Sequence, residues 1–404
     1  MLRREFIKTT ALLASAATVT GGLNSCVGTY HPKIINAIWN EKFVFDAPNR
    51  ANRLKQLILC GVMAPSGHNT QPWFFKIDDN KIEILPDYSR VLPIVDPFNR
   101  ELFISLGAVL ENILTSAPAF GFLVNYHIDD TKRKEKIIIN LKQNEKTQKT
   151  EKLQAMIDRQ TTRNYYTHKQ VPADLISYLQ LDKSQHTGYF FSESKTDFDL
   201  FLDYIKSSNN LLYGNKKFLD ELKKWIRWND SEAEETLDGL YIRALGESPT
   251  PSWFGKMMFN LTVTPKTMND KEAEYISTAS GLLFLFSEDG TKNWIETGKK
   301  MQDILIRLTA KGMKYAFHNQ PNESLPLRIP FAKDFGNKGL AGQIAIRVGW
   351  SESMPRSPRR RINDVYFLNC NKFIYYFVIF KKLNYYREIN DENFTAIIFA
   401  CFSC

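Results

Sequence analysis

The residues best suited to chemistry lie in one short string, residues 64–74, which has the sequence APSGHNTQPWF. Its prolines, serine, glycine and asparagine favour a turn, here one that closes a helix and leads into an extended strand. The Ser66 hydroxyl and the Asn69 amide can hydrogen-bond a ligand, Gly67 lets a ligand approach the backbone closely, and Trp73 is flat and apolar. Such a loop suits a planar heterocycle with a polar edge. On residue types alone, a purely structural turn is the better interpretation.

Two arginine clusters later in the chain could bind an anion. The first is the string RQTTR at 159–163, and the second is the string MPRSPRRR at 354–361. A planar guanidinium group can bind phosphate with two hydrogen bonds, and each charge-assisted bond contributes roughly 1.5–3 kcal/mol. The alternative interpretation is an exposed helix start for the first cluster and a solvated basic surface for the second.

The loop and the two arginine clusters, taken in this order, resemble motifs of the nitroreductase superfamily. Residues 64–74 are similar to its flavin loop, with the pattern A-P-S-[SG]-x-N-x-Q-P-W, and residues 159–163 are similar to its R-x-[ST]-x-[RK] motif. The order of the three motifs, with SPRR last, resembles the fused Acg-type FMN-binding oxidoreductases. The resemblance covers about residues 45–365, and the ordered set is more specific than any single motif.

This resemblance implies one FMN bound between two halves of the chain. The first half would contribute the loop and the second half both arginine clusters, whereas the mirror-related site would lack these motifs. Because the flavin carries out the redox chemistry, no catalytic base is expected. A metal site is not expected either, because the cysteines form no CxxC pair and the histidines form no HxH or HExxH motif. The expected FMN-binding residues are Ser66, Gly67, Asn69, Gln71, Arg159, Thr161, Arg163, Arg356, Arg359 and Arg360.

The activity that the resemblance implies is a two-electron transfer through flavin N5 to a small nitro- or quinone-like acceptor, with an unknown electron donor. One departure bears on this expectation: Gly67 replaces a serine that many relatives carry, which removes a hydroxyl from the flavin edge. Two alternatives therefore stay open. The chain could bind or sequester FMN without turnover, or it could retain the fold for protein interaction without a flavin.

Two further groups near these motifs are expected to have structural roles. His68 matches a variable position of the flavin loop and is interpreted as a loop histidine. Asp96, Arg100 and Glu101 precede a predicted helix and are expected to cap it and to form salt bridges, with a place in the wall of the site as the alternative.

An internal duplication indicates which elements position the motifs. Residues 106–121 and 297–312 share one pattern, in which an Ile-Leu pair and then a second glycine follow a first glycine at equal spacings. Apolar residues recur at helical spacing in both segments, and the closing residues Gly121 and Gly312 suit helix C-caps. Each segment is therefore predicted to be a helix of a repeated unit.

A β-like run precedes each of these helices, at 81–85 and at 281–286. Together with the resemblance, the repeat predicts an α+β fold of two tandem nitroreductase-like units, 40–150 and 151–365, each with a mostly antiparallel sheet. Such a chain would behave as a pseudo-dimer. An insert between 197 and 271 is predicted to be helical and could supply a lid.

The N-terminus resembles a twin-arginine export signal. Arg3 and Arg4 precede Phe6 and a mild Ala/Thr-rich segment, so residues 1–30 are expected to be a targeting segment outside the fold, with a cytosolic amphipathic helix as the alternative. Cys26 ends a string, LNSC, that resembles a lipoprotein cleavage site. The protein is expected in the periplasm or, through a lipid anchor at Cys26, on a membrane surface of a bacterium.

Residues 366–404 differ from the rest of the chain in composition. Aromatic residues make up 12 of these 39 positions, three of the five cysteines lie there, and the segment has no clean period of 2 or 3.6. We expect a tail foreign to the fold, with an ordinary final strand or helix as the alternative.

The overall composition excludes several classes of protein. With 404 residues, of which 43% are hydrophobic and 24% charged, the chain is neither disordered nor a coiled coil. The net charge of +9 is spread along the chain without a nucleic-acid-binding module, and the six histidines form no HxH or HExxH motif. The expected partners are small molecules, and the expected quaternary state is a monomer, as a pseudo-dimer, or a dimer.

Overall fold

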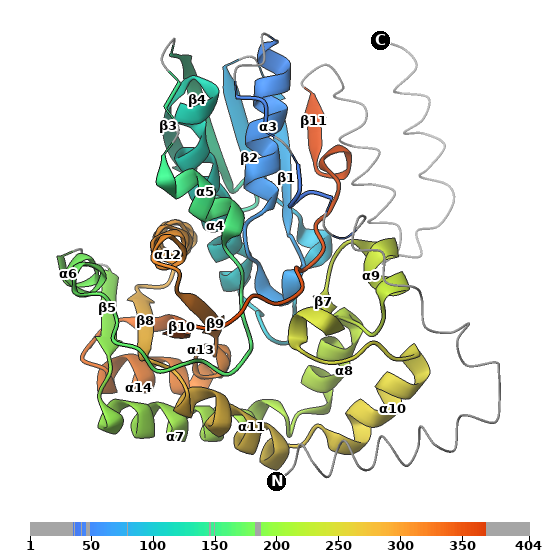
Figure 1. The fold of residues 1–404 in the computed structure, drawn as a ribbon, viewed down its shortest axis with the longest axis vertical. Helices are drawn as coiled ribbons and strands as arrows, with labels where there is room; N and C mark the ends of the chain where they lie inside the picture. Colours follow the sequence, from blue (N-terminus) through green and yellow to red (C-terminus); the bar gives the residue numbers. More distant parts are fainter. Residues whose placement is uncertain are drawn as a thin grey trace.

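The computed structural model describes residues 35, 37–41, 43–45, 49–78, 80–144, 147–148, 150–181 and 187–368. The predicted export signal, Cys26 and most of the predicted C-terminal tail lie outside these residues. The described chain has the predicted α+β class, with two sheets that lie on either side of a pair of crossing helices (Figure 1).

The first sheet is formed by β1 Trp73–Asp78, β2 Lys81–Pro86, β3 Phe122–Asp129, β4 Lys136–Gln143 and β11 Tyr366–Leu368. Its strand order is β11-β1-β2-β4-β3, and its pairs are antiparallel except for β11 with β1. Two helices belong to this half, α3 Arg50–Val62 and α4 Arg100–Ser116. The extended run expected at 81–85 is thus confirmed as β2.

Strand β11 extends the fold beyond the predicted boundary at residue 365. The Phe75 amide donates to the carbonyl of Val365 at 2.7 Å, and Tyr366–Leu368 then pair with β1. The ring of Phe367 packs on that of Phe74, with centroids 5.3 Å apart. The end of the second half therefore returns to the edge of the first sheet. The sequence did not indicate this strand, because residues 366–404 show no clean alternation of apolar and polar residues.

The second sheet is formed by β5 Thr187–Ser192, β8 Gly281–Ser287, β9 Lys314–Phe317 and β10 Ala341–Gly349. Its order is β5-β8-β10-β9 and all its pairs are antiparallel. The run expected at 281–286 is confirmed as β8. Strands β8 and β10 are buried along their whole length, which explains why they are almost continuously apolar.

The two sheets follow the same path of the chain. In each half, two strands precede a long helix and two follow it, and the strand orders β1-β2-β4-β3 and β5-β8-β10-β9 correspond one to one. The long helices are α4 and α12 Thr291–Ala310. Gly312, at φ 74°, follows the end of α12 by two residues, as expected for a helix end. In the first half α4 continues into a 3-10 turn, Ala117–Phe120, and Gly121 at φ 73° ends that turn rather than α4 itself.

Helices α4 and α12 cross between the sheets through a reciprocal glycine contact. A β-carbon on Gly107 would overlap the backbone carbonyl of Ile295, and one on Gly298 would overlap that of Ile104. Each glycine lies three residues after the isoleucine that faces the other glycine. The two glycines therefore set how closely the halves approach.

Helix α4 belongs to the core of the protein. Together with the short turn that follows it, α4 spans Arg100–Phe120, the one helical segment among the described residues that is long and apolar enough to cross a membrane. However, 78% of its most apolar window is buried inside the protein.

The shorter helices of the two halves are α5 Glu151–Asp158, α6 Ala173–Leu181, α13 Gln320–Glu323 and α14 Leu325–Asp334.

The insert between β5 and β8 is helical, as predicted. It contains α7 Lys195–Leu212, α8 Lys216–Trp225, α9 Asp230–Thr236, α10 Ser252–Thr262 and α11 Pro265–Ser277. A short parallel pair, β6 Ile226–Arg227 with β7 Leu240–Tyr241, holds its middle together. Helices α7 and α11 pack beside the second sheet, whereas α8, α9 and α10 extend to its side, below β1 and β11 (Figure 1).

Candidate functional site

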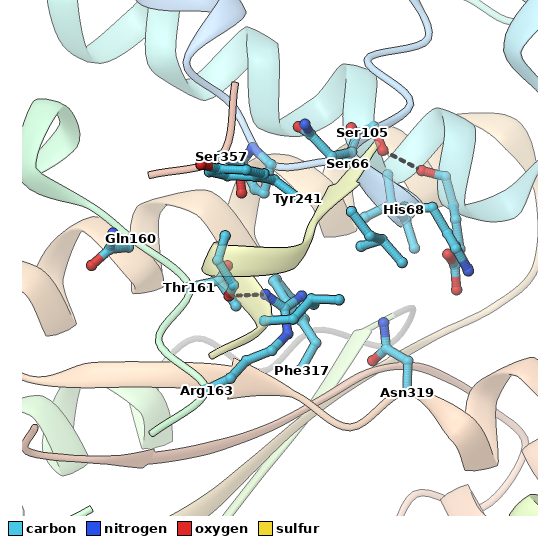
Figure 2. Close-up of a pocket in the computed structure, with 18 of the residues that line it drawn as sticks. Ser66, His68, Ser105, Gln160, Thr161, Arg163, Tyr241, Phe317, Asn319 and Ser357 are labelled. Carbon is cyan, nitrogen blue, oxygen red and sulfur yellow. Dashed lines mark hydrogen bonds between the residues drawn. The ribbon is translucent and has the colours of Figure 1, made fainter. Parts of the chain in front are cut away.

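A cavity of about 250 Å³ opens where the first half, the second half and the insert meet. Figure 2 shows Gln160, Thr161 and Arg163 on one side of it, and Ser105, His68 and Asn319 on the other. Asn69 and Arg163, which we predicted to share a site although they belong to different halves, both line it. The predicted residues in its wall are Ser66, Gly67, Asn69, Arg159, Thr161, Arg163, Arg356 and Arg359.

The loop after α3 reaches the cavity in a constrained backbone conformation. It contains a 3-10 turn at Gly67–Asn69, and His68, Asn69 and Gln71 have positive φ values of 48°, 54° and 51°. Each such conformation costs a residue with a side chain about 1–3 kcal/mol, so the surroundings must hold the loop in place. One of the contacts that hold the loop lies within it: the backbone N–H of Gln71 donates a hydrogen bond to Ser66 Oγ at 2.9 Å.

The side chain of Asn69 joins three segments of the chain. Its Nδ2 donates to the carbonyls of Gly239 in the insert and of Pro358 near the C-terminus, both at 3.1 Å. Its Oδ1 accepts from Nη1 of Arg359 at 2.8 Å. Both amide hydrogens are therefore used within the protein, so this residue positions Arg359 and the insert beside the cavity.

Arg159 and Arg359 converge on the end of α3. Arg159 Nη2 donates to the carbonyl of Met63 at 2.8 Å, and Arg359 Nη2 lies 3.5 Å from the same oxygen. Arg159 also donates to the Tyr315 hydroxyl. The Nε atoms of both arginines are buried and have no hydrogen-bond partner among the described residues.

Arg356 and Arg163 complete the cationic wall. Arg356 Nη1 donates to the carbonyls of Ile157 and Arg159, both at 3.0 Å, where α5 ends, and its guanidinium lies 4.5 Å from the ring centre of Trp39. Arg163 Nη1 is 3.4 Å from the carbonyl of Ala244 in the insert. Arg356 thus has a structural task as well as a place in the wall.

The positive charge of this wall is not neutralised. Within the part of the chain that the structure describes, Arg159, Arg163, Arg356 and Arg359 form no ion pair. Burial, followed by repulsion from Arg159, lowers the pKa of Arg356 to about 10, and burial with repulsion from Arg159 and Arg356 lowers the pKa of Arg359. Clustered cations that lack carboxylate partners favour an anionic ligand.

Two predicted residues, Gln71 and Arg360, do not line the cavity. Gln71 is fully buried, its Oε1 accepts from the Arg360 amide at 2.8 Å, and its Nε2 donates to the carbonyl of Leu237 at 2.9 Å. Arg360 Nη1 donates to the Gln71 carbonyl and faces Asp87 at 3.3 Å. These two residues fasten the loop to the C-terminal segment behind the site.

Two carboxyl groups, Glu101 and Glu323, also line the cavity. For Glu101 this matches the alternative of a place in the wall of the site, which Asp96 and Arg100 do not share, whereas no motif indicated Glu323. Burial raises the pKa of Glu101 to about 7, although Arg100, bonded to it at 2.8 Å, opposes the shift. Burial and the neighbouring Glu101 raise the pKa of Glu323 to about 8. Glu323 is therefore the carboxyl that retains its proton near neutral pH and can donate a hydrogen bond, whereas Glu101 is paired with Arg100.

The predicted capping cluster explains the glycine in the loop. Asp96 Oδ2 accepts from the amides of Glu101 and Leu102 at 2.8 and 3.1 Å, which confirms that Asp96 caps α4. The carboxylate of Glu101 then lies against the loop, where a β-carbon on Gly67 would be 2.8 Å from Glu101 Oε2. Glu101 thus occupies the space that a side chain at position 67 would need.

His68 lines the cavity with a neutral imidazole ring. Burial, with a contribution from Arg163, lowers the pKa of its imidazole to about 4, so the ring is neutral at physiological pH. Groups of three or more potential metal ligands are absent from the described residues.

The insert covers the cavity with apolar and aromatic side chains that no motif identified. They are Tyr213, Phe218, Leu222, Leu240, Tyr241, Ala244 and Leu245. Two contacts attach this cover to the first half: Asp238 pairs with Arg90, and Glu221 accepts from the amides of Ile94 and Val95. The predicted possibility that the insert borders the site therefore has a structural basis.

Comparisons with known proteins show similarity to nitroreductases over most of the chain. The chain is 24% identical over 328 residues to "Putative NAD(P)H nitroreductase Rv3131" of Mycobacterium tuberculosis, covering 78% of this chain and 91% of that protein. It is 33% identical over 72 residues to "Putative NAD(P)H nitroreductase acg" of the same species, covering 18% of this chain and 22% of that protein. No protein-family model matches the chain.

Among solved structures, a nitroreductase with bound FMN from Desulfitobacterium hafniense covers 54% of this chain and 97% of its own, at 11% identity and a TM-score of 0.32. The FMN-dependent nitroreductase NfnB of Mycobacterium smegmatis, in complex with NADPH, covers 52% and 94%, at 13% identity and a TM-score of 0.33. TM-scores of this size do not establish a shared fold.

Proposed function

We propose that this protein is an FMN-dependent oxidoreductase of the nitroreductase superfamily, with a single FMN site between its two halves. Bound FMN would supply a two-electron transfer through N5 to a small nitro- or quinone-like acceptor. The observation that carries the proposal is a cluster of four guanidinium groups that lines one cavity together with the constrained loop. Arg159 and Arg359 are buried, Arg163 and Arg356 are half-buried, and among the described residues none of the four has a carboxylate partner. The similarity to proteins named NAD(P)H nitroreductases supports the same chemistry.

The residues of the cavity fit the parts of such a cofactor. Arg159, Arg163 and Arg359 would hold the phosphate, since each brings positive charge that the protein leaves uncompensated. Ser66 and the backbone of Gly67 would face the flavin ring. The apolar wall would exclude water from the ring, and the protonated carboxyl of Glu323 would orient polar atoms of the ligand.

We also propose that the chain is a fused pair of nitroreductase-like units. The matching strand orders and the reciprocal contact between Gly107 and Gly298 support this arrangement. The sequence pattern further supports export by the twin-arginine route and a lipid anchor at Cys26. The electron donor is left open, because the similar proteins are named for NAD(P)H whereas export would separate the protein from soluble nicotinamide cofactors. Cell fractionation of the Arg3→Lys/Arg4→Lys variant tests export, because loss of the paired arginines should retain the protein in the cytoplasm.

The cofactor proposal is tested by the visible spectrum and by flavin titration of the purified protein. We expect a yellow protein that releases FMN on denaturation. Arg163→Ala should weaken FMN binding about tenfold or more, because one charge-assisted hydrogen bond contributes roughly 1.5–3 kcal/mol. Arg133→Ala, at an exposed position outside the cavity wall, is the control and should bind as the parent does. A colourless protein that does not bind added FMN would exclude the proposal.

A second candidate function, FMN binding without turnover, has support in the cover formed by the insert. Side chains such as Phe218 and Tyr241 close one side of the cavity, and Asn69 is bonded to the insert at Gly239. Anaerobic mixing with NADH, NADPH or a reduced quinone distinguishes the two functions. Bleaching of the bound flavin, followed by reoxidation by a quinone or a nitroaromatic compound, supports the enzyme; bound flavin that no donor reduces supports the binding protein.

A further inference from the structure

We propose that the outer face of α10 is a docking surface for a lipid bilayer that contains anionic headgroups. Trp253, Met257 and Leu261 recur every four residues and so lie on one face of this helix. Their exposed fractions are 61%, 42% and 69%, values that are unusual for three neighbouring apolar side chains on one helix. The proposal goes beyond the redox function and does not depend on a flavin.

The opposite face of α10 is firmly packed, so the exposed stripe is presented by a fixed helix. A β-carbon on Gly255 would overlap the ring of Trp228, which shows how closely the helix backbone lies on that ring. Phe259 is buried, and its ring meets that of Trp228 edge-on with centroids 6.1 Å apart. The helix is therefore amphipathic, with one face buried in the insert and the other in solvent.

The charge of the segment favours anionic lipid headgroups. Residues 248–269 contain Lys256 and Lys266 and no acidic residue. Lys266 pairs with Asp270 at 2.8 Å, whereas Lys256 has no ion-pair partner among the described residues and carries the positive charge of this face. Lys256 lies on α10 itself and is exposed. A tryptophan next to apolar and basic side chains is typical of helices that lie in the interface of a membrane.

The size of the stripe favours a bilayer over a protein partner. The three side chains expose roughly 300 Å² in total, whereas a stable protein interface buries about 800 Å² on each partner. A membrane surface has no such minimum, because each inserted side chain contributes its own transfer free energy of about 25 cal/mol per Å².

This docking surface lies one helix away from the cavity. Phe259, on the inner face of α10, packs in a cluster with Leu222 and Leu240, and both of these residues line the cavity. Contact with a bilayer would therefore place the cover of the cavity, formed by the insert, at the membrane surface.

Vesicle sedimentation tests the proposal on the full-length chain with Cys26→Ser, so that a lipid anchor cannot contribute. We expect tighter binding to phosphatidylcholine–phosphatidylglycerol vesicles than to pure phosphatidylcholine. Trp253→Ser/Met257→Ser/Leu261→Ser should weaken that binding at least about tenfold, given the apolar area removed. The matched control is Leu325→Ser/Ile329→Ser, which removes two exposed apolar side chains of α14 (47% and 53%) and should bind as the parent does.

Quenching by brominated lipids provides a second measurement that does not require the triple variant to fold. Trp253 is the exposed tryptophan, so vesicle binding should quench fluorescence in the parent and much less in Trp253→Phe. The proposal is overturned if the parent does not bind, if the triple variant binds as tightly as the parent, or if the control loses as much. A dimer that the triple variant converts to a monomer would also overturn it, because the stripe would then be a self-association surface.

Discussion

Gly67 lies where any side chain would meet the carboxylate of Glu101, which Arg100 holds at 2.8 Å. We predict that Gly67→Ser lowers the free energy of unfolding by about 1–3 kcal/mol, since overpacking a closed site has this cost. Chemical denaturation measures the change. In a Glu101→Ala background the same substitution should cost much less, and equal costs in the two backgrounds would show that Glu101 is not the obstacle.

Glu323 makes the stability of the protein depend on pH. Its pKa is raised to about 8 by burial and Glu101, with Asp96, Glu272 and Arg100 also facing it, and the ordinary value is 4.5. The native state therefore binds the proton more tightly than the unfolded state. This contribution is complete below the unfolded-state pKa and is lost as the pH rises through about 8.

We therefore predict that Glu323→Gln raises the thermal unfolding midpoint relative to the parent at about pH 8.5 and leaves it nearly unchanged at about pH 4. The same comparison with Glu352→Gln, at an exposed position, should show little difference at either pH. A shift for Glu323→Gln that is the same at both pH values would contradict a buried, proton-binding carboxyl.

For single residues, the sequence could indicate a place in the candidate site only where the residue belongs to a motif. Asn69 and Arg163 could be assigned to one site because each lies in a recognisable string. The sequence could not reveal that the amide of Asn69 is used to hold Arg359, since that depends on where the C-terminal segment passes. Glu323 and Tyr241 carry no local signal, because their approach to the cavity depends on how distant elements pack.

The close crossing of helices α4 and α12 depends on two glycines, Gly107 and Gly298. We predict that Gly298→Val lowers the free energy of unfolding by about 3 kcal/mol or more, because the new side chain would overlap the backbone of Ile104, which cannot rotate away. Lys292→Ala, on an exposed position of α12, is the control. A cost for Gly298→Val below that of an ordinary surface substitution, measured by denaturant unfolding, would refute the close crossing.

The same elements show what patterning can predict. Strands β2 and β8 and helices α4 and α12 follow from apolar periodicity and from glycines at helix ends, which are local properties. For Tyr366–Leu368 the alternative of a final strand holds and the expected foreign tail is wrong, because these three residues form β11 by pairing with β1. That pairing depends on where the chain returns to the first sheet, which periodicity does not show. The helical insert was predictable as secondary structure, but its place over the cavity was not.

At the scale of the whole molecule, Asp238 connects the insert with the first half by pairing with Arg90 and Arg227. We predict that Asp238→Asn loosens the cover and speeds FMN dissociation about tenfold, because it leaves two largely buried guanidinium groups without a charge partner. Stopped-flow measurement of flavin release compares it with Asp203→Asn, an exposed residue of α7 (side chain 74% exposed). Equal release rates would mean that this connection does not retain the ligand.

If one anionic flavin is held between the two halves of the chain, calorimetric titration of flavin-free protein should give one FMN per chain. Binding should weaken both for Arg163→Ala, in the second half, and for Asn69→Ala, which would release Arg359 from the first half. Two equivalent sites per chain, or weaker binding in only one of the two variants, would show that the halves do not share one flavin.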